Sequence, residues 1–137
     1  MNTELSKLLE VMDFRAFKDD DYEKILEVRS KDLPADYLDF ISTYNGAVGF
    51  LGEHRIFTNF WTVEEILMFN PYYKEDEFSQ SVTLIGSNGS GTNLGYYPKE
   101  KLFFYTDQFM MNDREITRCG PTFLDLVRYL SSLKEQF

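Results

Sequence analysis

The sequence predicts a single α+β domain that spans residues 1–137, with a mixed or antiparallel sheet flanked by helices. Two observations favour this class. Apolar residues at helical spacing dominate the first third of the chain and return at its C-terminus, whereas aromatic and β-branched runs fill most of the region between. Helices, then strands, then a closing helix is the order of an α+β domain, and a chain of this length has room for one hydrophobic core.

Two short helices are predicted at the start of the chain. The first has the i, i+3, i+4, i+7 spacing of an amphipathic helix, at Leu5, Leu8, Leu9 and Met12. The second is expected to begin in the run 19–21, because carboxylates cap free N–H groups and suit the positive end of the helix dipole. Grouped carboxylates also bind metals, and helix capping is the interpretation we favour. The predicted face of this helix holds Tyr22, Ile25, Leu26 and Arg29.

A third helix is expected to begin at Leu33-Pro34, with Pro34 in the first turn, where no backbone donor is needed. Asn45-Gly46 should end this helix, since a left-handed C-terminal cap favours these residues. The residues of its apolar stripe are Tyr37, Leu38, Ile41 and Tyr44, with Phe40 beside them.

A strand followed by a short helix is predicted next. Residues 54–61 (HRIFTNFW) are rich in β-branched and aromatic side chains, as strands are. Thr62 and Glu65 then have the spacing of a capping box, in which each residue satisfies a free N–H group of the other at a helix start. The helix should stop at Asn70-Pro71. Its apolar residues are Ile66, Leu67 and Phe69.

The second half of the chain is predicted to form most of the sheet. A Gly-rich loop at 87–95 follows the first strand of this half, and Gly120-Pro121-Thr122 leads into a closing helix. The expected strands are Ser81–Gly86, Leu94–Tyr97, Lys101–Thr106 and Arg114–Arg118. The apolar residues of the closing helix are Phe123, Leu124, Val127, Tyr129, Leu130 and Leu133.

Composition indicates a folded protein of the cytoplasm. Hydrophobic residues make up 43% and aromatic residues 17%, which is too apolar for a disordered chain. Cys119 is the single cysteine, so no disulfide can form within the chain. Residues 1–14 lack the basic and apolar segments of a signal peptide, and no apolar run approaches the ~20 residues of a membrane span. We therefore expect neither secretion nor membrane contact.

The net charge of −9 comes entirely from the first part of the chain. Residues 1–77 hold 17 acidic and 8 basic residues, whereas residues 78–137 hold 6 of each. Nucleic-acid binding depends on Lys and Arg side chains that displace condensed counterions, so direct binding to nucleic acid is disfavoured. An acidic surface instead speeds association with a basic protein partner. The alternative is that the charge only keeps the protein in solution.

No group of residues indicates catalysis, a metal site or a cofactor. His54 is the single histidine, so a histidine pair is impossible, and we expect it at the surface. Cys119 precedes a helix start, where a thiol can become reactive, and a buried apolar role is favoured. The consecutive acids 75–77 diverge, whereas a metal ion or an acid/base pair needs them to converge. We expect a binding protein rather than an enzyme.

The Gly-rich loop is the one segment with the appearance of a ligand site. Residues 86–92 (GSNGSGT) have the glycine spacing of a phosphate-binding loop, but Thr92 stands where that motif requires lysine. A strand rather than a helix is expected to follow, so no helix dipole would face a phosphate. A turn between strands is favoured over a ligand loop formed by Ser87, Asn88, Gly89, Ser90 and Gly91.

Five motifs, taken in order, resemble the SUKH superfamily, which includes the yeast Smi/Knr cell-wall regulator and many bacterial proteins. The motifs are LPADYLDFISTYNGAVGF, HRIFTNFWTVEEI, SVTLIGSNGSGTNLGYY, KLFFYTDQF and GPTFLDLVRYL. The similarity extends from about Leu33 to the closing helix. It implies an α+β fold with a concave binding face, and it implies that bacterial members commonly act as immunity proteins against toxins, many of them nucleases. Loop 86–95 is richer in Gly and Ser than this resemblance implies.

The resulting hypothesis is an immunity protein that blocks the basic groove of a toxin, with acidic residues that speed association and aromatic residues that anchor the complex. The candidate acids are Asp19, Asp20, Asp21, Glu64, Glu65, Glu75, Asp76 and Glu77, and the candidate anchors are Trp61, Tyr72 and Tyr73. Core packing is the alternative role of Trp61. Two other functions stay open, namely a regulatory or scaffolding module with several partners and a small-ligand binder that uses loop 86–95.

Overall fold

A computed structural model describes residues 1–74 and 76–137 of the chain. The described residues form a seven-stranded sheet in which every pair of neighbours is antiparallel and the strands follow chain order. The α+β class is confirmed, and of the two predicted sheet types the structure has the antiparallel one. The strands are β1 (Asp13–Phe14), β2 (Ala47–Leu51), β3 (Ile56–Phe60), β4 (Thr83–Ser87), β5 (Thr92–Tyr97), β6 (Leu102–Asp107) and β7 (Thr117–Gly120).

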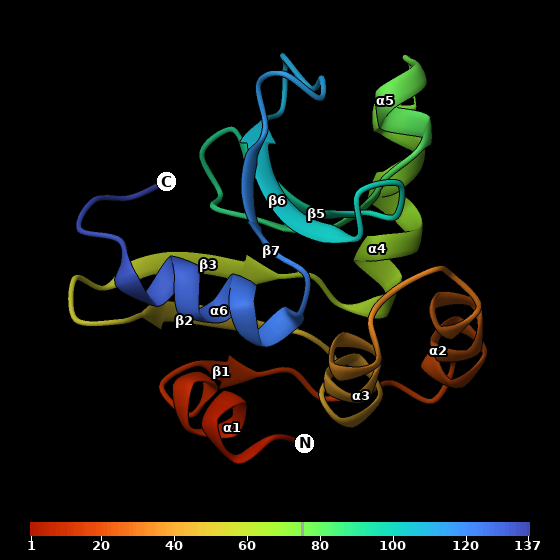
Figure 1. The fold of residues 1–137 in the computed structure, drawn as a ribbon. Helices are drawn as coiled ribbons and strands as arrows, with labels where there is room; N and C mark the ends of the chain where they lie inside the picture. Colours follow the sequence, from red (N-terminus) through yellow and green to blue (C-terminus); the bar gives the residue numbers. More distant parts are fainter. Residues whose placement is uncertain (75) are drawn as a thin grey trace.

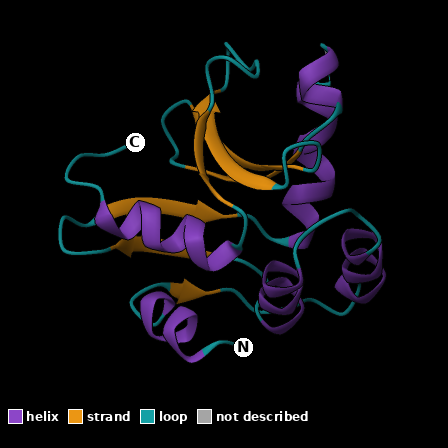
Figure 2. Ribbon diagram, in the orientation of Figure 1, coloured by secondary structure: helices purple, strands orange, loops and turns teal. Residues whose placement is uncertain are grey.

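Helices border this sheet, as Figure 1 and Figure 2 show. Helix α6 crosses in front of β2 and β3, α1 lies beside β1, and α2 to α5 follow the right-hand side of the view. Their bounds are α1 (Thr3–Leu9), α2 (Asp21–Arg29), α3 (Ala35–Thr43), α4 (Val63–Phe69), the 3₁₀ helix η1 (Asn70–Tyr73), α5 (Glu77–Gln80) and α6 (Phe123–Ser132). No helix in the described ranges is long and apolar enough to cross a membrane.

The hydrophobic core lies between the sheet and helices α3 and α6. Phe123 of α6 lies at its centre, with its ring centroid 4.8 Å from that of Phe40, 5.1 Å from that of Phe60 and 5.2 Å from that of Tyr37. All four side chains are fully buried. Because burial of a Phe-sized side chain stabilises a fold by about 1.5–3 kcal/mol, this cluster fixes α3 and α6 on the sheet.

Both ends of α6 are held by specific contacts. Thr122 and Asp125 form a capping box at its start, and the Asp36 carboxylate of α3 accepts hydrogen bonds from the first two N–H groups of the helix at 3.0 and 2.9 Å. At the other end, a Cβ placed on Gly52 would lie 2.1 Å from the Ser131 carbonyl oxygen, and Gly52 has φ +74°. The β2–β3 turn therefore approaches α6 too closely for any side chain but hydrogen.

Most predicted elements are present with shifted ends. The predicted capping box of Thr62 and Glu65 is confirmed at the start of α4. Strand β5 begins at Thr92 rather than Leu94, so the predicted loop 87–95 shrinks to a turn at 88–91. The segment predicted as strand 114–118 pairs with β6 only from Thr117 to Gly120.

The predicted face of α2 is wrong. Tyr22 and Leu26 are 68% and 53% exposed, whereas Asp21 and Val28 are buried. The reason is tertiary, because α2 packs against α4 and α3 rather than over the sheet. The N-cap of α2 also differs from the prediction, since Asp20 makes no capping hydrogen bond with its side chain.

The third helix differs from its prediction at both ends. Pro34 is the N-cap of α3 and not a residue of its first turn, and the helix ends at Thr43 with Tyr44 in an extended conformation. Gly46 has φ +76°, but its role is steric, since a Cβ there would lie 2.4 Å from the Phe60 carbonyl oxygen. The short strands β1 and β2 and helix α5 were not predicted.

The sheet bends between β3 and β4, where pairing is shortest (Figure 1). These strands share two register pairs, from Asn59 to Ser87 and from Phe60 to Gly86. Beyond them, the side chain of Asn70 takes the place of a neighbouring strand. The backbone N–H of Leu84 donates to Asn70 Oδ1 at 2.8 Å, and Asn70 Nδ2 donates to the Leu84 carbonyl at 2.9 Å. Asn70 thus joins the end of α4 to the sheet.

Candidate functional site

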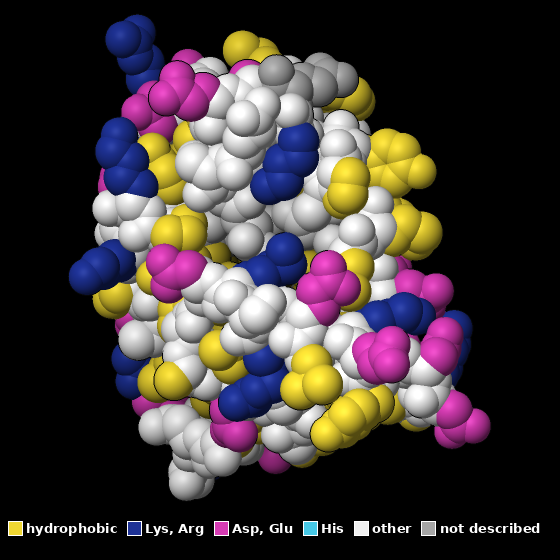
Figure 3. Space-filling model, turned by 90° about the vertical axis from the view of Figure 1, so that its right-hand side faces the viewer, with side chains coloured by type: hydrophobic (Ala, Val, Ile, Leu, Met, Phe, Trp, Pro, Cys, Tyr) yellow, Lys and Arg dark blue, Asp and Glu magenta, His cyan; other side chains and the backbone are white. Residues whose placement is uncertain are grey.

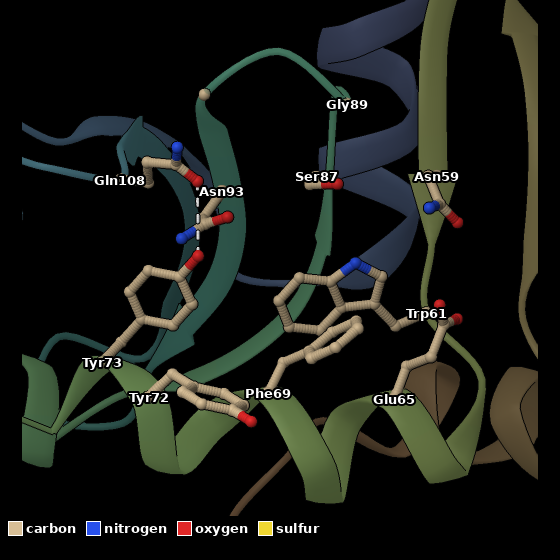
Figure 4. Close-up of a pocket in the computed structure, with 11 residues that line it drawn as sticks. Asn59, Trp61, Glu65, Phe69, Tyr72, Tyr73, Ser87, Gly89, Asn93 and Gln108 are labelled. Atoms are coloured by element: carbon tan, nitrogen blue, oxygen red, sulfur yellow. Dashed lines mark hydrogen bonds between the residues drawn. The ribbon is translucent and has the colours of Figure 1, made fainter.

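A pocket of about 600 Å³ lies on the face of the sheet opposite to α6, which stands behind the strands in Figure 4. Strands β3, β4 and β5 form one wall, α4 and η1 form the floor, and the β4–β5 turn closes the far end. This volume lies within the ~300–1,000 Å³ of small-molecule sites. The described residues that line it are Asn59, Trp61, Glu65, Phe69, Tyr72, Tyr73, Ser87, Gly89, Gly91, Asn93 and Gln108.

A row of short polar side chains crosses the sheet at this pocket. Register pairs join Asn59 of β3 to Ser87 of β4, Ser87 to Asn93 of β5, and Asn93 to Thr106 of β6. Directly paired residues of antiparallel strands point to the same face, so the four side chains form one line. Asn93 and Thr106 are each 2% exposed. The row therefore places hydrogen-bonding groups at the bottom of a pocket with aromatic walls.

Aromatic side chains from the end of β3, from α4 and from η1 border the rest of the pocket. Trp61 is 4% exposed and packs edge-to-face on Phe69, with ring centroids 5.1 Å apart. The Tyr73 hydroxyl donates to Gln108 Oε1 at 3.3 Å, and Tyr72 is 72% exposed. The three predicted anchors thus line one site. Trp61 has both of its predicted roles, because it packs in the core and also lines the pocket.

The carboxylate on the pocket wall is paired with Arg15. Arg15 Nη1 donates to Glu65 Oε1 at 2.8 Å, and Arg15 Nη2 donates to Asn59 Oδ1 at 2.8 Å. Glu65 Oε1 also accepts the Thr62 N–H at 3.0 Å as part of the capping box. Because Arg15 holds the amide oxygen of Asn59, the NH₂ group of that amide is turned toward the pocket, as Figure 4 shows. The charge of the wall is therefore compensated, and Asn59 acts there as a donor.

The candidate acids of α2 and α4 are paired with two lysines. Lys24 Nζ lies 3.2 Å from the Asp20 carboxylate, 3.7 Å from that of Asp21 and 3.9 Å from that of Glu64, and Lys18 Nζ lies 3.5 Å from Glu64. The hydrogen bond from Lys24 lowers the pKa of the Asp20 carboxyl below its usual value. Figure 3 shows acidic and basic side chains interspersed over this side of the molecule rather than one acidic field.

Asp21 is an internal structural residue. It is 1% exposed, and its Oδ2 accepts hydrogen bonds from the Lys18 backbone N–H at 2.7 Å and from Asn45 Nδ2 at 3.1 Å. Asn45 Oδ1 in turn accepts the N–H of Val63, the first residue of α4, at 2.9 Å. This chain of bonds joins α2, the end of α3 and α4. Burial leaves Asp21 no surface for direct contact with a partner, whereas Asp19 is exposed.

An exposed apolar surface adjoins the mouth of the pocket. Tyr72, Phe109 and Met110 are 72%, 84% and 61% exposed, and two shallow hollows connect them with the carboxylates of Asp76 and Glu77. We call these five residues the Phe109 surface. Large apolar side chains gathered in the open are typical of interaction sites, and Met side chains adapt to varied partners. The sequence prediction included Tyr72 and the two acids but neither Phe109 nor Met110.

The Gly-rich turn contributes to the pocket through part of its residues. Ser87, Gly89 and Gly91 line the pocket, and Ser90 is exposed at the tip of the turn. Asn88 is 6% exposed, and its Oδ1 accepts two backbone N–H groups of the turn at 2.9 and 3.1 Å. Asn88 therefore shapes the turn and has no free acceptor for a ligand at that oxygen.

The residues weighed for catalysis lie apart from the pocket. His54 is exposed in the β2–β3 turn. Cys119 is buried in β7, and burial raises the pKa of its thiol to about 12. In the part of the chain that the structure describes, no cluster of His, Cys, Asp and Glu has the arrangement of a metal site. Glu75, one of the candidate acids, lies outside the described residues.

Sequence reasoning missed three polar residues of the pocket, Asn59, Asn93 and Gln108. A polar residue in a strand has the pattern of a solvent-facing position, and only the register of four strands shows that these amides converge. The alternation within IFTNFW, which puts Asn59 on the face away from Phe60, was the one signal available for it.

Comparisons with known proteins identify no relative. No protein family matches the sequence, and no curated protein is significantly similar to it.

Proposed function

We propose that the chain is a non-enzymatic protein-binding module, and specifically a cytoplasmic immunity protein that neutralises a bacterial toxin. The observation that carries the proposal is the Phe109 surface. Tyr72, Phe109 and Met110 expose large apolar areas side by side, which costs free energy in water and is recovered when a partner covers them. The resemblance of the sequence motifs to the SUKH superfamily supports the choice of an immunity protein among binding modules.

The charges around this surface favour a basic partner. Asp76 and Glu77 are exposed beside the apolar side chains, and the chain as a whole has a net charge of −9. Acids at the rim of an apolar centre speed the approach of a basic protein, while the apolar centre sets the lifetime of the complex. The same charge disfavours direct contact with nucleic acid. A basic substrate groove of a nuclease toxin has the complementary chemistry.

The test measures binding to the purified product of the neighbouring gene by calorimetry. Tyr72→Ser is expected to weaken binding by about tenfold or more, the equivalent of about 1.4 kcal/mol. Tyr22→Ser is the matched control, because Tyr22 is 68% exposed on α2 and lies outside the surface. Affinity should also fall between about 50 mM and about 300 mM salt, since steering by exposed charges is screened.

Three results would contradict the proposal. The first is no association with the neighbouring product at low salt. The second is an equal loss of affinity in Tyr72→Ser and Tyr22→Ser, which would place the interface elsewhere. The third is turnover of a substrate by the purified chain that one side-chain substitution abolishes, which would make the protein an enzyme.

A further inference from the structure

Asn93 is a buried amide with unused hydrogen-bonding capacity. It lines the pocket at 2% exposure, and its contact within the described residues runs from Nδ2 to the Met111 sulfur at 3.9 Å. A thioether is a weak acceptor, and the amide oxygen of Asn93 receives no hydrogen bond from those residues. An amide buried in this way costs about 1–3 kcal/mol. A ligand that pairs with Asn93 in the pocket would offset this cost.

Other polar groups of the pocket are free as well. The indole N–H of Trp61 points into the space in Figure 4 and makes no hydrogen bond to any described residue. The NH₂ group of Asn59 faces the same space because Arg15 holds the amide oxygen. The Ser87 hydroxyl lies between them in Figure 4 and can donate or accept. The pocket therefore presents fixed N–H donors, an amide oxygen and a hydroxyl within one polar row.

Charge excludes ionic ligands from this pocket. None of the described residues that line it is lysine or arginine, so a phosphate or carboxylate would lose its hydration without a counter-charge. The Glu65 carboxylate is already paired with Arg15 at 2.8 Å, so a cation would find no free carboxylate on the wall. The best complement is a neutral ligand.

We propose that this pocket binds a neutral carbohydrate of one or two sugar rings. A sugar hydroxyl donates and accepts at once, which suits a wall that mixes N–H donors with the amide oxygen of Asn93 and the hydroxyl of Ser87. The C–H face of a sugar ring packs on aromatic side chains, which Phe69 and Tyr72 provide at the floor. The volume of about 600 Å³ accommodates such a ligand. This activity does not depend on a protein partner.

The binding test uses a reporter that the protein already contains. Trp61 is the single tryptophan of the chain and lines the pocket, so its fluorescence reports on occupancy without a label. The probes are glucose, galactose, mannose, N-acetylglucosamine, maltose, cellobiose and lactose. Adenosine and N-acetylarginine amide serve as comparison ligands of other chemistry. A saturable change is expected with at least one sugar and with neither comparison ligand.

Substitutions separate a ligand contact from a structural residue. Asn93→Val is expected to weaken sugar binding by about tenfold or more while the melting temperature stays unchanged or rises, because valine suits a strand and removes a buried amide without a partner. Ser87→Ala should also weaken binding. Its matched control is Ser90→Ala, since Ser90 belongs to the same turn but does not line the pocket.

Three outcomes would overturn the proposal. They are the absence of saturation with every sugar of the panel, saturable binding of adenosine or N-acetylarginine amide in place of a sugar, and equal effects of Ser87→Ala and Ser90→Ala. A strongly destabilised Asn93→Val would assign Asn93 a structural role instead. None of these measurements involves the toxin, so failure here is distinct from failure of the protein-binding function.

Discussion

Asn70→Ala is expected to destabilise the fold far more than its position at a helix end suggests. Asn70 is 6% exposed, and its amide makes three hydrogen bonds, to the Ile66 carbonyl at 2.7 Å, to the Leu84 carbonyl at 2.9 Å and from the Leu84 N–H at 2.8 Å. The Ile66 carbonyl keeps its bond to the Asn70 backbone N–H in the variant. Both backbone groups of Leu84 lose the Asn70 amide as their partner.

The expected loss follows from those two groups. A buried backbone group without a partner costs about 1–3 kcal/mol, so two give a central value of about 4 kcal/mol. A water molecule that enters the space left by the amide would recover part of this, and we expect a net loss of about 3 kcal/mol. For a protein of this size, that corresponds to a fall of about 10 °C in melting temperature.

The assay is urea unfolding followed by circular dichroism, with Asn112→Ala as the control. Asn112 Oδ1 also accepts two backbone N–H groups, at 2.9 and 3.1 Å, but in an exposed loop where water can replace it. The control should lose less than about 1 kcal/mol. A loss for Asn70→Ala below about 1 kcal/mol, or equal to that of the control, would refute the view that Asn70 replaces a neighbouring strand.

Three further substitutions or conditions test other contacts. Tyr37→Phe should raise stability by about 1 kcal/mol in urea unfolding, because the buried Tyr37 hydroxyl has no hydrogen-bond partner among the described residues. Gly52→Ala should lower stability by more than about 2 kcal/mol, since its Cβ would meet the Ser131 carbonyl, and an unchanged melting temperature would refute that contact. Burial raises the pKa of the Cys119 thiol to about 12, so thiol reagents should react with it only after unfolding. Its contribution to stability is complete below the ordinary thiol pKa of about 9 and is lost as pH rises above it, which Cys119→Ala should abolish in pH-dependent unfolding.

The fold could be predicted from local sequence signals where those signals act locally. The capping box of Thr62 and Glu65 predicted the start of α4 correctly, because both partners lie within one turn. The face of α2 could not be predicted, since Tyr22 is apolar but exposed and Asp21 is acidic but buried. Burial there depends on the packing of α2 against α4, which no periodicity within α2 records. Strand β2 was missed because its Ala-Val-Gly-Phe-Leu sequence directly follows Asn45-Gly46 and was taken as part of the turn.

The candidate site could be predicted only in part for a related reason. Trp61, Tyr72 and Tyr73 were predicted as anchors from their chemistry, and the structure shows that they line one pocket with the Gly-rich turn. Asn93 was missed because its importance depends on its register with Ser87, which is set by turn geometry at a distance in the chain. Chemistry therefore indicated side chains capable of binding, and only the sheet showed which of them meet.

The short pairing between β3 and β4 has a consequence for the way the molecule opens. Strands β1–β3 and β4–β7 are two tightly paired ribbons, and α6 contacts strands of both. The row from Asn59 to Ser87 crosses the boundary between them. A fluctuation that parts the ribbons would separate these side chains without unfolding either ribbon. Backbone amides at this boundary should therefore exchange with solvent faster than those in the centre of β5, so that the binding face can breathe while the rest of the sheet stays intact.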